Sequence, residues 1–292
     1  MHLNQKHGFT LIELSIVLVI IGLLVGGVLV GRDLIKSAQL RSVISDIDKF
    51  NAAANTFQLK YGCLPGDCRN ATSLFGQFAS CGAWNGIDDF GSNTTCNGNG
   101  DGKVVQIAPG DPSAFNWWRY DESMLFWHHL SRAGLISGKY TGMWSDTNGV
   151  ATGDVPVSKL ENGCYSINYS DANSTEINAP YSLMNSSFIA LGSFTRPTDG
   201  LDLVDCVAGL YSLPAINAKW IDDKLDDGAP FTGTVQTTLD RYGGDWNYSG
   251  AVGSYPGCTN ENGTTWPYTS TPTIYATAAT TTTCQLYFKT KF

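Results

Sequence analysis

The chain has 292 residues, of which 26 are acidic and 18 are basic, and its formal net charge is −8. This acidic balance argues against nucleic acid as a main partner, because binding to phosphates needs a basic face. The sequence also contains no phosphate-binding loop, dinucleotide fingerprint or recognisable pairing of nucleophile and base, so we do not expect an enzyme.

The most informative segment is at the N-terminus, where a short polar leader ends in Gly8 directly before an apolar run. Residues 14–31 are all uncharged, and a helix of this length can cross the hydrocarbon core of a bilayer. A secretory signal would have its small cleavage-site residues after the apolar segment, whereas this glycine precedes it. Glu13 interrupts the apolar run, and a carboxylate at the centre of a membrane helix costs roughly 2.5 to 3.5 kcal/mol. An ionisable residue in such a place is expected to have a function.

Residues 6–13 and the apolar run behind them resemble the class III leader of type IV prepilins and pseudopilins. The resemblance implies that prepilin peptidase cleaves between Gly8 and Phe9, that the new amine is methylated, and that the apolar segment stays on the mature protein. It also implies that Glu13 pairs with the N-terminal ammonium of Phe9 in a neighbouring subunit. The alternative is a glutamate near a helix start, stabilised only by the helix dipole and the membrane interface.

Beyond Arg32 the apolar residues recur at spacings of three and four, which predicts an amphipathic continuation of the same helix. This stripe consists of Leu40, Val43, Ile47, Phe50, Ala54, Phe57 and Tyr61. Gly62, Pro65 and Gly66 should end the helix. We therefore expect a leader at 1–8, a transmembrane and assembly helix at 9–31, its amphipathic continuation at 32–62, and a globular head at 63–292.

All eight cysteines lie in the expected head, which indicates an oxidising compartment. They are Cys63, Cys68, Cys81, Cys96, Cys164, Cys206, Cys258 and Cys284. Sequence does not fix their pairing, and bridges between nearest neighbours are our hypothesis. A bridge from Cys258 to Cys284 would resemble the one that closes the C-terminal region of many pilins. Zinc binding by the first four is the competing interpretation, although no C-x-x-C pair is present.

Two acidic segments of the head are candidate calcium sites. Asn97, Asn99 and Asp101 place oxygen atoms at alternate positions before a turn glycine, like the opening of an EF-hand loop. Its twelfth position is Ala108 rather than a glutamate, so further carboxylates would have to come from Asp88, Asp89, Asp111 or Glu122. Any affinity should then be weak, roughly 10⁻⁴ to 10⁻³ M. The alternative is a solvated turn of glycine and asparagine.

The second acidic segment contains Asp222, Asp223, Asp226 and Asp227. If residues 218–225 form a helix closed by Gly228, the last two aspartates lie at its negative end, and like charges recur four residues apart. A cation or a basic partner would offset this repulsion, and so could solvent and salt at an exposed site. The segment with Pro230, Gly233 and Val235 also resembles a C-terminal pattern of large pilin-like proteins.

The rest of the head is expected to add a helix and several strands to the long N-terminal helix. Asp121 and Glu122 should begin a helix that runs to Gly134 and carries His128 and His129, an adjacent pair with poor geometry for a metal. Trp117, Trp118 and Trp127 should fill the core, although an aromatic patch could also bind sugar. Residues 232–239 and 285–289 read as strands. The fold class is therefore α+β, with the long helix packed on an antiparallel sheet and with loop-rich, disulfide-bonded insertions.

These features favour a structural subunit, held in the bacterial inner membrane with its head in the periplasm and then added to a periplasmic or surface filament. Its expected partners are other pilin or pseudopilin subunits, prepilin peptidase and the inner-membrane assembly platform. The size of the mature chain favours a minor pilin or pseudopilin, whereas the large tip subunit of type II secretion pseudopili usually lacks the acid kept here as Glu13. The alternatives are a membrane-anchored adhesin or ligand-binding protein that does not polymerise, and a tethered hydrolase. No cofactor is required, and calcium is a possible bound ion.

Overall fold

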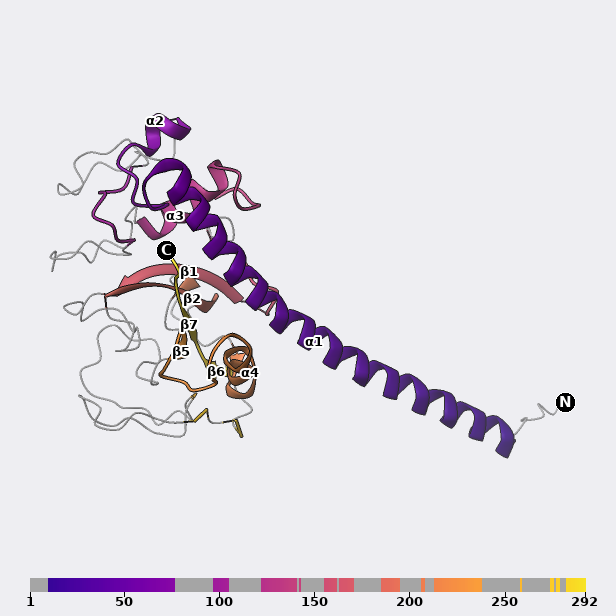
Figure 1. The fold of residues 1–292 in the computed structure, drawn as a ribbon. Coiled ribbons are helices and arrows are strands. Elements are labelled where there is room, and N and C mark those ends of the chain that lie inside the picture. The colour runs from indigo at the N-terminus through magenta and orange to yellow at the C-terminus, as the bar shows by residue number, and fades with distance from the viewer. Residues whose placement is uncertain are drawn as a thin grey trace, which may run out of the picture.

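The fold consists of one long helix whose second half packs on a head that contains an antiparallel sheet (Figure 1). The computed structural model describes residues 10–76, 97–104, 122–140, 142, 155–161, 163–170, 185–194, 206–207, 213–237, 258, 274–275, 277–278 and 282–292. The α+β class expected from the sequence is confirmed.

Helix α1 (Leu11–Tyr61) is unbroken for 51 residues, a length of about 77 Å at the helical rise. Its buried residues begin only at Leu40 and follow the apolar stripe to Phe57. The helix ends where the sequence predicts, because Gly62 takes a left-handed φ of 73° that suits glycine, and its N–H donates to Gln58 O at 2.8 Å.

The main sheet has the strand order β1-β2-β7-β5, and β3 (Cys206–Val207) also pairs with β2. Its strands are β1 (Gly163–Ser170), β2 (Ser186–Phe194), β7 (Leu286–Lys289) and β5 (Val235–Thr237), with antiparallel pairing throughout. A second, two-stranded sheet pairs β4 (Leu213–Pro214) with β6 (Thr282–Cys284). The C-terminal strand is thus central in the main sheet.

The core lies between the sheet and the second half of α1. One row of apolar side chains crosses four strands in register, from Ile167 through Ile189 and Phe288 to Val235, and all four belong to the core that includes the α1 stripe. Phe50 on α1 contacts Tyr165 of β1 edge-on, with ring centroids 5.2 Å apart. These contacts fix the direction in which α1 leaves the head.

Three shorter helices complete the described part of the head: α2 (Ala71–Phe75), α3 (Glu122–Arg132) and α4 (Ala215–Leu225). α3 supplies Trp127, which is fully buried and packs edge-on against Phe50 with centroids 4.9 Å apart. This agrees with the core role expected for Trp127, whereas Trp117 and Trp118 lie outside the described residues.

Several element boundaries differ from those expected. α4 begins at Ala215, three residues earlier than the sequence suggested, because Pro214 supplies an extended residue at its N-cap. The strand expected at 232–239 is only Val235–Thr237 within the described residues, since residues 226–234 form hydrogen-bonded turns instead. β1 and β2 were not predicted from the sequence.

Candidate functional site

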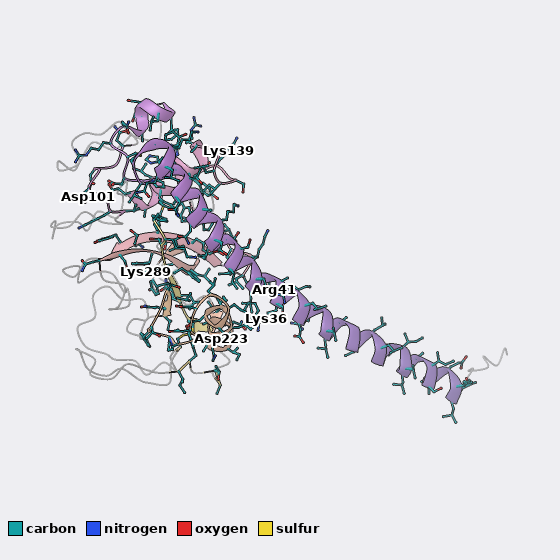
Figure 2. The ribbon with its side chains drawn as sticks, viewed as in Figure 1. Lys36, Arg41, Asp101, Lys139, Asp223 and Lys289 are labelled. Atoms are coloured by element: carbon teal, nitrogen blue, oxygen red, sulfur yellow. A yellow bond between two sulfur atoms is a disulfide. The ribbon has the colours of Figure 1, made fainter. Side chains whose placement is uncertain are left out.

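The first half of α1 is apolar and exposed. The exposed fraction is 89% for Leu11, 73% for Leu23 and 62% for Ile35, whereas Val43 and Ala54 are fully buried. Figure 2 shows the first half of α1 extending away from the head, with its side chains next to no described part of the head. By length and composition this helix can cross a membrane. Such a continuous apolar surface needs a covering of lipid or of other helices.

The first turn of α1 is closed by a capping box between Thr10 and Glu13. Glu13 Oε2 accepts hydrogen bonds from Thr10 N and from Thr10 Oγ1, both at 2.8 Å, and Glu13 N donates to Thr10 Oγ1 at 3.3 Å. Each residue therefore satisfies an N–H that the start of a helix leaves without a partner. The carboxylate is used within its own subunit, at the end of the helix whose dipole favours negative charge.

Gly8 and Phe9, the predicted processing site, lie outside the described residues. The expected pairing of Glu13 with the ammonium of Phe9 in a neighbouring copy therefore stays a prediction.

The first acidic segment forms a cluster different from an EF-hand loop. Carboxylate oxygens of Asp67, Asp101 and Glu122 lie within 4.8 Å of one another, so two of the three come from outside the loop. Asn97 instead accepts hydrogen bonds from Thr72 N at 2.8 Å and Thr72 Oγ1 at 3.0 Å. Asp88, Asp89 and Asp111, the other carboxylates considered, lie outside the described residues.

Asp67 is buried, and its carboxylate is hydrogen-bonded by the backbone of the loop that follows. It accepts from the N–H of Gly100, from Asp101 N at 3.1 Å and from Gly102 N at 2.8 Å. Burial raises the pKa of Asp67, while these hydrogen bonds act in the opposite direction. Three successive amides thus surround the carboxylate, as they would surround any bound anion.

The second cluster joins Asp222, Asp226 and Asp227 at the end of α4, with oxygens again within 4.8 Å. Asp222 is fully buried and accepts from Tyr275 Oη at 2.9 Å and Gly228 N at 3.3 Å. Asp227 accepts from Ala229 N at 2.9 Å, and Asp226 from Val235 N at 3.0 Å. Asp223 is not a member, because it forms an ion pair with Lys219 at 2.5 Å.

Protonation and hydrogen bonds relieve the repulsion expected in this second cluster. Burial raises the pKa of Asp222 to about 7, and the charges of Asp227 and Asp226 add to that rise. The backbone N–H groups of Val235 and Ala229 stabilise the carboxylates of Asp226 and Asp227, respectively. Both clusters offer the hard oxygen ligands that calcium prefers. Calcium binding at either cluster stays a prediction.

Two disulfides are described, and both join nearest neighbours in the sequence. Cys63 pairs with Cys68 directly after α1, and Cys258 pairs with Cys284 at the end of β6. Cys164 is also in a disulfide. The zinc interpretation is wrong for Cys63 and Cys68, because their sulfur atoms are bonded to each other. Cys81 and Cys96 lie outside the described residues, and only the backbone of Cys206 is described.

The adjacent histidines of α3 are structural. Both are buried, and they point to different partners: His129 Nδ1 accepts from Gly66 N at 2.8 Å, while His128 Nδ1 lies 2.7 Å from Tyr140 O. Burial lowers the pKa of His128. His129 therefore anchors the turn that follows α1 to α3.

Comparison with known proteins matches the N-terminal part of the chain. Residues 3–29 match the family model described as the prokaryotic N-terminal methylation motif. With the long apolar helix that begins at Leu11, this match is consistent with a type IV pilin-like protein and with a membrane-anchored precursor. No curated protein and no solved structure matches the chain.

Sequence reasoning missed three participants in these sites. Thr10 could have been found, because Thr10-x-x-Glu13 before an apolar run is the signature of a capping box. Asp67 and Tyr275 gave no local signal, since each meets its cluster only through the tertiary fold.

Proposed function

We propose that this chain is a structural subunit of a type IV pilus or a type II secretion-like filament, most simply a minor pilin or pseudopilin. Prepilin peptidase removes residues 1–8, residues 9–31 form the assembly helix in the inner membrane, and residues 32–62 attach it to the head at 63–292. The assembly platform then adds the subunit to the filament, in the periplasm or at the cell surface. The N-terminal methylation motif supports a precursor of this type.

The observation that carries the proposal is the length of α1 that the head leaves uncovered. From Leu11 to Ile35 the large apolar side chains are at least half exposed. Lipid can cover them in the precursor, and neighbouring α1 helices can cover them in a filament. The glycines at 22, 26, 27 and 31 have open space around their Cα atoms, so a neighbouring backbone can approach closely there.

Glu13 positions each subunit against its neighbour, so that the filament forms in one register. Its capping box with Thr10 is adequate for a helix end at the membrane interface, where water is near. Inside a bundle of helices the carboxylate is removed from water, and an ammonium from an adjacent subunit then becomes the strongest available partner. A subunit without that charge inserts into the membrane but lacks the pair that positions it.

Glu13→Gln is the sharpest test, because glutamine also serves at the third position of a capping box and so preserves the helix start. We expect the variant to reach the membrane with an intact head and to be absent from filaments sheared from cells. Glu161→Gln, which removes an exposed carboxylate of the head, should be incorporated normally. Normal incorporation of Glu13→Gln would refute the proposal. Surface binding without any filament would favour the membrane-anchored adhesin instead.

A further inference from the structure

The stripe that packs α1 on the head changes character at the point where the head ends. Within the head its first positions are Leu40, Val43 and Ile47, which are buried. Continued toward the N-terminus at the same spacings of three and four, the stripe passes through Lys36 and Arg32. Both of these residues are exposed. The side of α1 that faces the head therefore carries two cations between the head and the apolar run.

These two cations also mark the end of the apolar run. The run covers residues 14–31, between Glu13 and Arg32, and at the helical rise it is about 27 Å long. The hydrocarbon core of a bilayer is about 30 Å thick, and each headgroup layer adds roughly 5 to 8 Å. Arg32 then lies about 1.5 Å and Lys36 about 7.5 Å beyond the run. This is the depth of the lipid headgroups.

Neither cation is used within the described part of the chain. Arg32 and Lys36 form no hydrogen bond or ion pair there, and neither does Asp33, the one acid among residues 32–45. Figure 2 shows Lys36 on the part of α1 that lies near α4, but Asp223 of α4 is already in an ion pair within its own helix. The charges of Arg32 and Lys36 are therefore available to an anionic partner outside the subunit.

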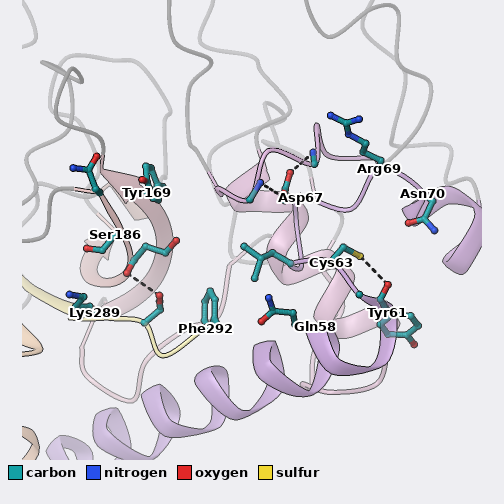
Figure 3. Close-up of a pocket in the computed structure, with 17 residues that line it drawn as sticks. Gln58, Tyr61, Cys63, Asp67, Arg69, Asn70, Tyr169, Ser186, Lys289 and Phe292 are labelled. Atoms are coloured by element: carbon teal, nitrogen blue, oxygen red, sulfur yellow. Dashed lines mark hydrogen bonds between the residues drawn. The ribbon is translucent and has the colours of Figure 1, made fainter.

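The cavity beside the C-terminal end of this helix has no such selectivity. It measures about 780 Å³, and Figure 3 shows Asp67 and Arg69 both on its wall. Asp67 belongs to the carboxylate cluster with Asp101 and Glu122, so acids and a base meet there. Charge therefore selects a ligand class at the two cations of α1 but not in this cavity.

We propose that Arg32 and Lys36 bind the phosphates of anionic phospholipids in the leaflet on the head side of the membrane. Arginine can hold two oxygens of one phosphate, and lysine acts on a phosphate as a point charge. Because both side chains lie on the side of α1 that faces the head, the bound lipids lie between the bilayer surface and the head and fix the depth of α1. This inference rests on the proposed function only in that α1 lies in a membrane before assembly.

The test uses the full chain in detergent, titrated with an equimolar mixture of phosphatidylglycerol and phosphatidylcholine and measured by native mass spectrometry. Both lipids carry a phosphate, but only phosphatidylglycerol has a net negative charge, so the ratio of the two bound lipids reports selection by charge. We expect phosphatidylglycerol to be retained over phosphatidylcholine by about twentyfold. Arg32→Gln and Lys36→Gln should each reduce that preference by about fivefold.

Lys49→Gln is the matched control on the same helix, because Lys49 is exposed and lies about 20 Å farther along α1 than Lys36. It should leave the lipid ratio unchanged. Lys36→Arg keeps the charge and should retain the preference. All of these positions are exposed on a helix and glutamine is a good helix former, so the variants should fold normally. An unchanged melting midpoint of the head checks this.

Equal retention of the two lipids would overturn the proposal, as would an unchanged lipid ratio in the double variant Arg32→Gln/Lys36→Gln. If that double variant also failed to enter filaments, the two cations would be assigned to acids of a neighbouring subunit instead. Release of bound phosphatidylglycerol by an equal concentration of inorganic phosphate would identify a site for free phosphate and would also refute lipid binding. The Glu13→Gln subunit should select lipid like the parent protein, so the failure of the proposed function is distinguishable from the failure of this inference.

Discussion

Phe50→Ala should strongly destabilise the head, because Phe50 joins α1 to both α3 and β1 through aromatic contacts. Its side chain is 4% exposed, and its ring meets Trp127 of α3 at 4.9 Å and Tyr165 of β1 at 5.2 Å. Removing a buried phenylalanine costs about 3 to 5 kcal/mol, and each lost aromatic pair accounts for about 0.5 to 1.5 kcal/mol. We therefore expect a loss of about 4 kcal/mol in the free energy of unfolding.

The measurement is urea unfolding of the mature chain in detergent, followed by tryptophan fluorescence, to which Trp127 contributes from within the contact. With a slope of about 2 kcal/mol per molar urea, the midpoint should fall by about 2 M. Leu59→Ala is the matched control on the same helix, since Leu59 is 89% exposed and its loss should change stability by at most about 0.5 kcal/mol. Equal midpoints for the two variants would refute the packing of α1 on the head.

Three further predictions concern the head. Asp222 has a pKa raised to about 7, so the stability that it contributes is complete below about pH 4 and is lost as the pH rises through 7. Asp222→Asn should flatten that decline, and identical pH profiles of the melting midpoint for the variant and the parent protein would contradict this. Gly66→Ala should destabilise the head more than Gly102→Ala does. Both positions have positive φ, but of these two only Gly66 would place a Cβ against the Glu122 carbonyl and 3.1 Å from Phe126 N. Equal falls in the melting midpoint of the two variants would refute the clash. Calcium held by the acidic clusters would raise the melting midpoint, so a midpoint unchanged by chelation would remove both predicted sites.

The long helix could be predicted from sequence because all of its signals are local. Its apolar run, its stripe at spacings of three and four, and Gly62 at its end lie within one segment, and the structure follows them. The strands β1 and β2 could not be recognised as easily. In β1, Tyr165 and Ile167 face the core, while Ser166 and Asn168 lie on the other face of the sheet. Those polar residues are also buried, so the alternation of apolar and polar residues does not mark one face of this strand as exposed to solvent.

The candidate sites show the same division between local and tertiary information. The acids at 222, 226 and 227 are close in sequence and meet in the structure, whereas Asp67 reaches Asp101 across 34 residues. No spacing rule in one sequence could join the last two. Arg32 and Lys36 show the opposite case, because their place in line with the apolar stripe is visible in the sequence and only the point at which the head ends comes from the structure.

Mass spectrometry of the N-terminus of the protein isolated from its own cells tests the central claim most directly. The account predicts a mature chain that begins at Phe9, carries a methyl group on its amine, and retains α1 in full. A chain that still begins at Met1, or one trimmed beyond Gly31, would contradict it, because neither could present a free ammonium next to Glu13 on an intact assembly helix.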